Sequence, residues 1–249
     1  MTIDPIHQFN IEPLFTLGHI GKYPIAITNS TVYMFVAVGI IGLLTLATGR
    51  QLIPGRMQSI AEISYEFVAT TIRSTAGPEG MKFFPLIFCL FMFICVSNLV
   101  GIIPYTFTIS SHIIVTAALA LLVFFLVLIY GIYKNGLKFF SIFVPKGVPG
   151  YIVPLVMFIE ILSFLLRPVS HSVRLFANML AGHIALKVFA GFVAMLGVSL
   201  GALGWIGGIA PLALTVALTA LELLVAFLQA YVFAILTCIY LNDALHPGH

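Results

Sequence analysis

The feature that most limits how this chain can fold is the length of its uncharged, apolar stretches. Neither Phe83 to Ile103 nor Ile113 to Tyr133 contains a charged side chain. Each stretch matches the roughly 20 apolar residues with which an α-helix crosses a bilayer. Only 8% of the residues are charged and 61% are hydrophobic, whereas a soluble domain has about 25% charged residues. The sequence therefore predicts an all-α integral membrane protein, because helices satisfy their own backbone groups within lipid.

The remaining pattern divides a single predicted membrane domain, 1–249, into successive elements. The start of the chain lacks the basic region and apolar core of a cleavable signal, so insertion is expected to rely on the transmembrane helices. Ile60, Ile63 and Phe67 recur at helical spacing with acidic residues between them, which is typical of a helix lying on a membrane surface. We expect an extended or short-helical surface arm over 1–29, a transmembrane helix over 30–49, an amphipathic surface helix over 51–77, a transmembrane hairpin over 82–134, and long helices over 150–190 and 211–242.

The two long apolar stretches near the end of the chain are too long to stand upright in a bilayer. At 1.5 Å per residue, a helix over 150–190 would be about 60 Å long, twice the ~30 Å thickness of the hydrocarbon. It must therefore be steeply tilted or broken into two spans. No hydrophilic turn separates the two halves, so the tilted arrangement is preferred, and 211–242 poses the same problem in milder form.

The basic residues indicate which loops face the cytoplasm. Arg50 and Arg56 follow the first span, and Lys134, Lys138 and Lys146 follow the hairpin, whereas the turn between the two hairpin helices has no lysine or arginine. By the positive-inside rule both basic loops are cytoplasmic, or matrix-facing in a mitochondrion. A bacterial cytoplasmic membrane is the preferred location, with the mitochondrial inner membrane as the alternative.

Arg174 is the residue that most constrains function. It lies amid apolar sequence long enough to bury it, which costs ~2.5–3.5 kcal/mol at the bilayer centre on insertion scales. Arg174 cannot avoid this free-energy cost by losing its proton, because a guanidinium stays charged in proteins. Arg174 therefore needs an anionic partner. A carboxylate on another subunit is one candidate; the alternatives are an internal pair with Glu160 or Glu222, or a side chain that reaches the interface.

Polar residues lie on the same helix face as Arg174, and a second set of aligned polar residues lies on the second long helix. Ser170 and Asn178 share its helix face at i−4 and i+4, and Glu222 and Gln229 are aligned seven residues apart. His183 lies about half a turn from Arg174 around the helix axis. This separation favours two proton routes over one. A histidine and a desolvated carboxyl are suitable proton stations at neutral pH. For His183 and for Glu222 alike, the alternative interpretation is a structural hydrogen bond.

Several other functions lack their sequence signals. The formal net charge of +3 comes from scattered residues, so no nucleic-acid partner is expected. The three cysteines show no metal-ligand spacing and are expected to be small buried hydrophobes. We expect no metal, no cofactor and no catalytic residue, since there is no HExxH, GxSxG or Asp-rich motif. A self-contained proton-coupled transporter or channel is the main alternative, although no internal repeat is visible.

Four segments resemble the subunit a family of F-type ATP synthases. They are the string Arg174–His183, RLFANMLAGH; the later Glu222 with Leu228–Phe233, LQAYVF; the opening Asp4–Phe9, DPIHQF; and Asn98–Tyr105, NLVGIIPY. The resemblance covers nearly the whole chain, and the arginine in its RLFxNMxxGH setting is its most specific part.

The resemblance implies a proton-translocating stator subunit with no nucleotide chemistry of its own. It implies two long, steeply tilted helices packed against a rotating ring of c subunits, with peripheral-stalk b subunits and the rest of the synthase as further partners. By position, Arg174 would face the ring carboxylates and separate two offset half-channels. Asn178, His183, Glu222 and Gln229 would line the inlet, and Glu160 and Ser170 would belong to the outlet. Relatives with the acidic and histidine positions exchanged leave open whether His183 or Glu222 accepts the proton first.

Overall fold

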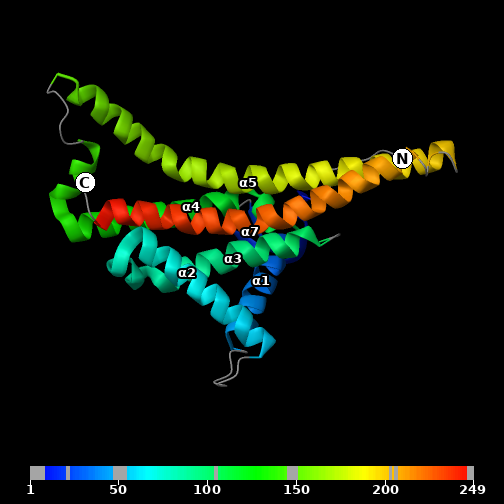
Figure 1. The fold of residues 1–249 in the computed structure, drawn as a ribbon, viewed down its shortest axis with the longest axis horizontal. Coiled ribbons are helices and arrows are strands. Elements are labelled where there is room, and N and C mark those ends of the chain that lie inside the picture. The colour runs from blue at the N-terminus through cyan, green and yellow to red at the C-terminus, as the bar shows by residue number, and fades with distance from the viewer. Residues whose placement is uncertain are drawn as a thin grey trace. The chain divides into compact units, whose positions relative to one another are not determined.

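The computed structural model of the chain describes residues 9–20, 23–46, 55–103, 106–144, 151–201, 204 and 207–245. Helices make up most of it (Figure 1), and they are α1 Asn29–Leu46, α2 Arg56–Gly80, α3 Phe84–Ile102, α4 Ile113–Asn135, α5 Val153–Leu200 and α7 Ile209–Leu245, with short 3-10 turns at Met81–Phe83, Ile109–Ser111 and Gly136–Phe143. Five helical stretches of the described residues are long and apolar enough to cross a membrane. The predicted helical membrane class is confirmed.

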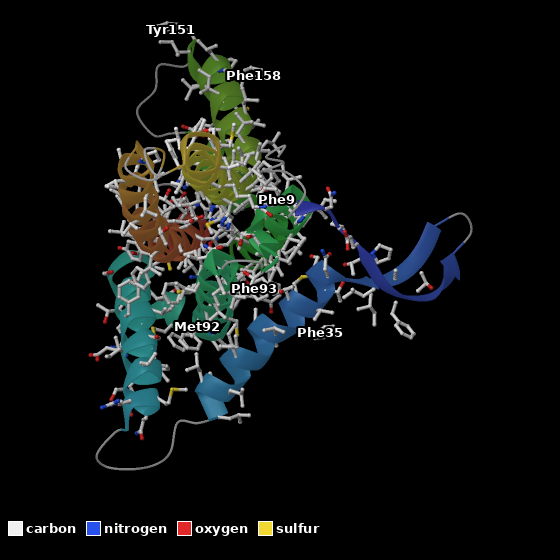
Figure 2. The ribbon with its side chains drawn as sticks, turned by 90° about the vertical axis from the view of Figure 1, so that its right-hand side faces the viewer. Phe9, Phe35, Met92, Phe93, Tyr151 and Phe158 are labelled. Atoms are coloured by element: carbon white, nitrogen blue, oxygen red, sulfur yellow. The ribbon has the colours of Figure 1, made fainter. Side chains whose placement is uncertain are left out.

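The arm before α1 contains the two strands of the described residues. Strand β1, Pro13–Ile20, pairs antiparallel with β2, Tyr23–Thr28, in a small sheet with two register shifts (Figure 2). The sequence analysis expected an extended or short-helical arm without pairing its segments, and residues 1–8, 21 and 22 of that arm lie outside the described part. Asn29 joins the arm to α1, since its side-chain oxygen accepts from the Ser30 backbone N–H at 2.8 Å and its amide donates to the Asn10 carbonyl at 3.0 Å.

Helix α2 changes direction near its end. Gly77 has φ 69° and ψ −172°, a backbone conformation that glycine adopts without strain and other residues rarely adopt. The buried side of α2 includes Val68, Ala69 and Ile72, whereas Ile60 and Ile63 of the same helix are exposed. Its place on a membrane surface stays a prediction, and residues 51–54 of the expected segment lie outside the described part.

The chain divides into two compact units, each built from separate stretches of sequence. Residues 1–43, 93–112 and 175–229 form the first unit, and 44–92, 113–174 and 230–249 form the second. The second unit is held by an aromatic core in which Phe164 lies within 5.1–6.3 Å, between ring centroids, of Phe124, Phe139 and Phe143. Gly131 leaves room for this packing, because a Cβ there would lie 2.3 Å from a ring carbon of Phe139.

Helices α5 and α7 are longer than a bilayer is thick. They contain 48 and 37 residues, which correspond to about 72 Å and about 56 Å at 1.5 Å per residue. Helix α5 continues without a break through the middle of the predicted stretch and on to Leu200, so the alternative of two separate spans does not describe it. Both lengths exceed the ~30 Å that a helix perpendicular to the hydrocarbon layer needs to cross it, and the steep tilt of the two helices stays a prediction.

Candidate functional site

A buried histidine and a buried carboxyl lie together in the first unit. His183 on α5 and Glu222 on α7 are 7% and 5% exposed, and 3.1 Å separates His183 Nδ1 from Glu222 Oε1. The contact lacks the geometry of a hydrogen bond, so neither carboxyl oxygen has a hydrogen-bond partner among the described residues. A buried polar atom without a partner costs free energy. This carboxyl therefore needs a proton of its own or contact with water.

Gly182 makes the approach of the two helices possible at this point. A Cβ on residue 182 would lie 2.9 Å from Glu222 Oε1 and 3.4 Å from Glu222 Cδ. Any larger side chain would push the carboxyl group away from its present position. The glycine immediately before His183 thus sets where the Glu222 side chain can lie.

The other ring nitrogen of His183 is bound by the turn between α3 and α4. Thr108 Oγ1 lies 2.9 Å from His183 Nε2 in a buried hydrogen bond. Thr108 is itself fixed, because its backbone carbonyl accepts from Ser111 Oγ at 2.6 Å. The ring of Phe9 lies 6.3 Å from the His183 ring, between centroids. His183 is therefore oriented by residues from α5, α7 and the turn, with the arm nearby.

Asn98 extends this polar cluster into α3. Its side chain is fully buried, its amide donates to the Ala226 carbonyl of α7 at 3.2 Å, and its oxygen accepts from Ser110 Oγ at 2.6 Å. Gly101, one turn later, lets Thr108 pack closely, because a Cβ there would lie 2.9 Å from Thr108 Cγ2. The turn between α3 and α4 thus makes two separate buried hydrogen bonds, from Ser110 to Asn98 and between Thr108 and His183.

A hydrogen bond joins α5 to α7 one to two turns from the contact between His183 and Glu222. Asn178 donates its amide to Gln229 Oε1 at 2.9 Å. Gln229 is 5% exposed, whereas Asn178 is exposed on the surface of α5. The pair carries polar atoms from the interior of the first unit to that surface.

His112, at the end of the turn, is outside the helices. Its ring stacks on Phe107 with a centroid distance of 4.9 Å and an interplanar angle of 12°. Partial burial lowers the pKa of His112 below its ordinary 6.5. The ring is therefore neutral at neutral pH and brings no positive charge to the turn, which already lacks lysine and arginine.

Arg174 belongs to the second unit and lies on the exposed surface of α5. Within that unit it forms no ion pair with any residue that the structure describes; the ion pairs there are Lys134 with Glu79 and Arg167 with Asp243. The neighbouring Val173 is also exposed. A permanent cation on an exposed, mostly apolar helix face is costly in lipid.

The structure brings together some of the residues predicted from the sequence. Glu222 lies against His183, and Asn178 is bonded to Gln229. Glu160 and Ser170 lie ten residues apart on α5, half-buried and exposed respectively, and no described contact joins them.

The sequence analysis missed the residues that orient His183. Thr108, Asn98 and Gly182 were not singled out as site residues. Asn98 carried a signal, because it is an amide within an otherwise apolar span. The contacts of Thr108 and Gly182 depend on how distant segments pack, which local spacing does not specify.

Comparison with known proteins places the chain in a family. A family model described as ATP synthase A chain matches residues 31–242. The chain belongs to the ATP synthase A chain family.

Relatives in this family are similar over the whole chain. A protein of Bradyrhizobium diazoefficiens named ATP synthase subunit a is 86% identical over 249 residues, covering all of both chains. Proteins of the same name from Rhodopseudomonas palustris strain TIE-1 and Nitrobacter winogradskyi are 76% and 75% identical, covering 100% and 99% of this chain and all of each relative. Membership of the ATP synthase A chain family confirms the resemblance seen in RLFANMLAGH and disfavours a self-contained transporter.

We expect Gly182→Ala to slow proton-driven ATP synthesis by roughly tenfold, because small displacements of a reacting group carry large costs in rate. The added methyl group displaces the Glu222 carboxyl from its position against His183. The measurement is the rate of ATP synthesis in energised inverted membrane vesicles that contain the complete synthase.

Gly39→Ala is the matched control, because a Cβ at Gly39 in α1 meets nothing within 4 Å. Equal synthesis rates in the two variants, at equal amounts of assembled complex, would contradict the role given to Gly182.

Proposed function

We propose that the chain is the proton-translocating stator subunit of an F-type ATP synthase in a bacterial cytoplasmic membrane. Family membership and the bacterial relatives support this assignment. The single observation on which the proton role depends is the buried His183–Glu222 pair, oriented by Thr108 and left with carboxyl oxygens without hydrogen-bond partners. A buried imidazole beside a buried carboxyl is suited to passing protons.

The direct partner of Arg174 in this proposal is a ring of c subunits. Arg174 is charged and exposed on α5, and it forms no ion pair within its own unit among the described residues. A ring carboxylate on the opposing surface would supply the missing negative charge. Long, steeply tilted α5 and α7 would follow the ring, while the b subunits and the remaining synthase subunits would bind elsewhere on the chain.

Two half-channels would reach the ring from opposite sides of the membrane. His183, Glu222, Asn178 and Gln229 form the inlet in this proposal, since the first two are buried together and the second two lead to the α5 surface. Glu160 and Ser170 belong to the outlet, nearer the start of α5, which follows a lysine-rich and therefore cytoplasmic loop.

The mechanism follows from the cost of charge in lipid. A ring carboxyl is neutral while it faces hydrocarbon, loses its proton to the outlet, passes Arg174 as a carboxylate, and is reprotonated from the inlet. Each proton that crosses 100 mV releases about 2.3 kcal/mol, and access from only one side at each station makes the rotation directional. The fixed charge of Arg174 prevents protons from passing directly between the half-channels.

Arg174→Ala is expected to abolish proton-driven ATP synthesis while the synthase still assembles, because the ring carboxylate loses its counter-charge and the half-channels lose their barrier. The measurement is ATP synthesis in energised inverted vesicles, with the amount of assembled complex determined in the same membranes. Lys138→Ala, which removes an exposed cation of the cytoplasmic loop, is the control. Coupled synthesis at the wild-type rate in Arg174→Ala would refute the assignment.

Glu222→Gln is expected to slow synthesis by roughly tenfold, a smaller loss than that caused by Arg174→Ala, because one proton-transfer group is removed but its volume and polarity remain. Synthesis rates are measured as a function of pH on the inlet side. Glu66→Gln neutralises an exposed carboxylate of α2 and serves as the control. An unchanged rate at every pH would remove Glu222 from the inlet.

A further inference from the structure

Lys187 is a charged residue of α5 that the proposed half-channels do not use. It lies within a long apolar helix and is half-buried. Among the described residues of the first unit, it is the only lysine or arginine. A charged side chain within a membrane helix is costly, and such residues usually serve transport. Lys187 therefore requires an explanation of its own.

The position of Lys187 on α5 places its charge close to His183. The two residues are four apart on one helix, so they are neighbours on the same face, with about 5–6 Å between their Cβ atoms. Side chains on a helix lean toward its N-terminus, which directs the long Lys187 side chain back toward the turn that carries His183. The Lys187 ammonium acts electrostatically on the imidazole.

The other described groups around His183 bring one further charge, that of a carboxyl. Glu222 Oε1 of α7 lies 3.1 Å from His183 Nδ1. Thr108, from the turn between α3 and α4, is neutral, and the arm residue near the ring is a phenylalanine. His112 in the same turn is neutral at neutral pH, and α3 carries no charged side chain. Within the first unit, the charges that act on His183 are therefore a carboxyl on α7 and an ammonium on α5.

A proton shared by His183 and Glu222 has two arrangements. In the first, both groups are neutral and the proton is on the carboxyl. In the second, an imidazolium lies beside a carboxylate, which puts a second positive charge next to Lys187. Like charges repel strongly in a water-poor environment. Lys187 therefore favours the first arrangement, in which a neutral imidazole offers one donor and one acceptor nitrogen.

We propose that Lys187 is a positioning residue of the inlet, whose positive charge keeps His183 neutral so that the transferred proton resides on Glu222. A proton from the periplasmic side forms the O–H bond of the Glu222 carboxyl. That bond breaks when the proton passes on to the ring carboxylate, and Glu222 becomes a carboxylate again. His183 and Lys187 carry the same charges before and after the transfer. The sequence alone left the choice between His183 and Glu222 open.

This inference rests on the proposed stator function, and its test uses the complete synthase in inverted vesicles, whose lumen is the periplasmic side. The rate of ATP synthesis is measured against the pH of the lumen, with the outer pH and the membrane potential held constant. The variants are Lys187→Gln and Lys187→Met, which remove the charge, and Lys187→Arg, which keeps it. Lys138→Gln, which removes an exposed cation from the cytoplasmic loop, is the matched control.

Lys187→Gln and Lys187→Met are expected to shift the midpoint of this pH profile upward by about one pH unit, because the inlet is easier to load with a proton once the cation that repels it is gone. Lys187→Arg and Lys138→Gln should keep the wild-type midpoint. The shift should also vanish in a His183→Gln background, because the charge of Lys187 acts through His183.

A wild-type midpoint in both uncharged variants would overturn the proposal. An equal shift in Lys187→Arg would do the same, because packing rather than charge would then be its cause. A shift that persists in the His183→Gln background would mean that Lys187 acts on another group, which also contradicts the proposal. If His183→Gln is inactive, the comparison of Lys187→Gln with Lys187→Arg decides.

Assembly of the synthase is measured in the same membranes. If one uncharged variant fails to assemble, the other gives the pH profile. If both fail while Lys187→Arg assembles, the charge of Lys187 serves assembly rather than proton transfer, and the proposal is wrong. Loss of coupling in Arg174→Ala alongside wild-type pH profiles in all Lys187 variants would exclude this role of Lys187 and leave the stator function standing.

Discussion

The permanent charge of Arg174 is the constraint on which the rest of this molecule depends. A guanidinium does not lose its proton in proteins, and hydrocarbon does not tolerate it without a counter-charge. Arg174 is nevertheless exposed on α5, outside the ion pairs of its own unit among the described residues. We propose that a neighbouring subunit supplies the carboxylate that balances this charge. An internal pair with Glu222 would compete with the contact that Glu222 makes to His183.

The polar groups of the first unit are arranged so that His183 has one orientation. Thr108 binds one ring nitrogen and Glu222 lies against the other, while Gly182 leaves the space that the carboxyl occupies. Buried polar networks are costly when partly satisfied, and in this one neither carboxyl oxygen of Glu222 has a hydrogen-bond partner among the described residues. A path that admits water and protons to this point would relieve that cost, which is why we propose that Glu222 serves proton transport.

Composition and periodicity were sufficient to predict the membrane helices, because uncharged runs of about 20 residues have few other stable structures. The importance of Arg174 followed from its placement in an apolar stretch, and the alignment of Glu222 with Gln229 followed from helical geometry. The pairing of β1 with β2 and the close approach of Gly182 to Glu222 were not predictable in this way, since both depend on which distant segments meet.

The most direct test of the central claim is the side from which water reaches each half-channel. Thr108→Cys beside His183 and Ser170→Cys before Arg174 can be introduced separately into a synthase whose Cys89, Cys95 and Cys238 are replaced by alanine. Each is then treated with a charged, membrane-impermeant thiol reagent from one side at a time. The account predicts that residue 108 reacts only from the periplasmic side and residue 170 only from the cytoplasmic side. Reaction of both residues from the same side would contradict it, because Arg174 would then not separate two opposed paths.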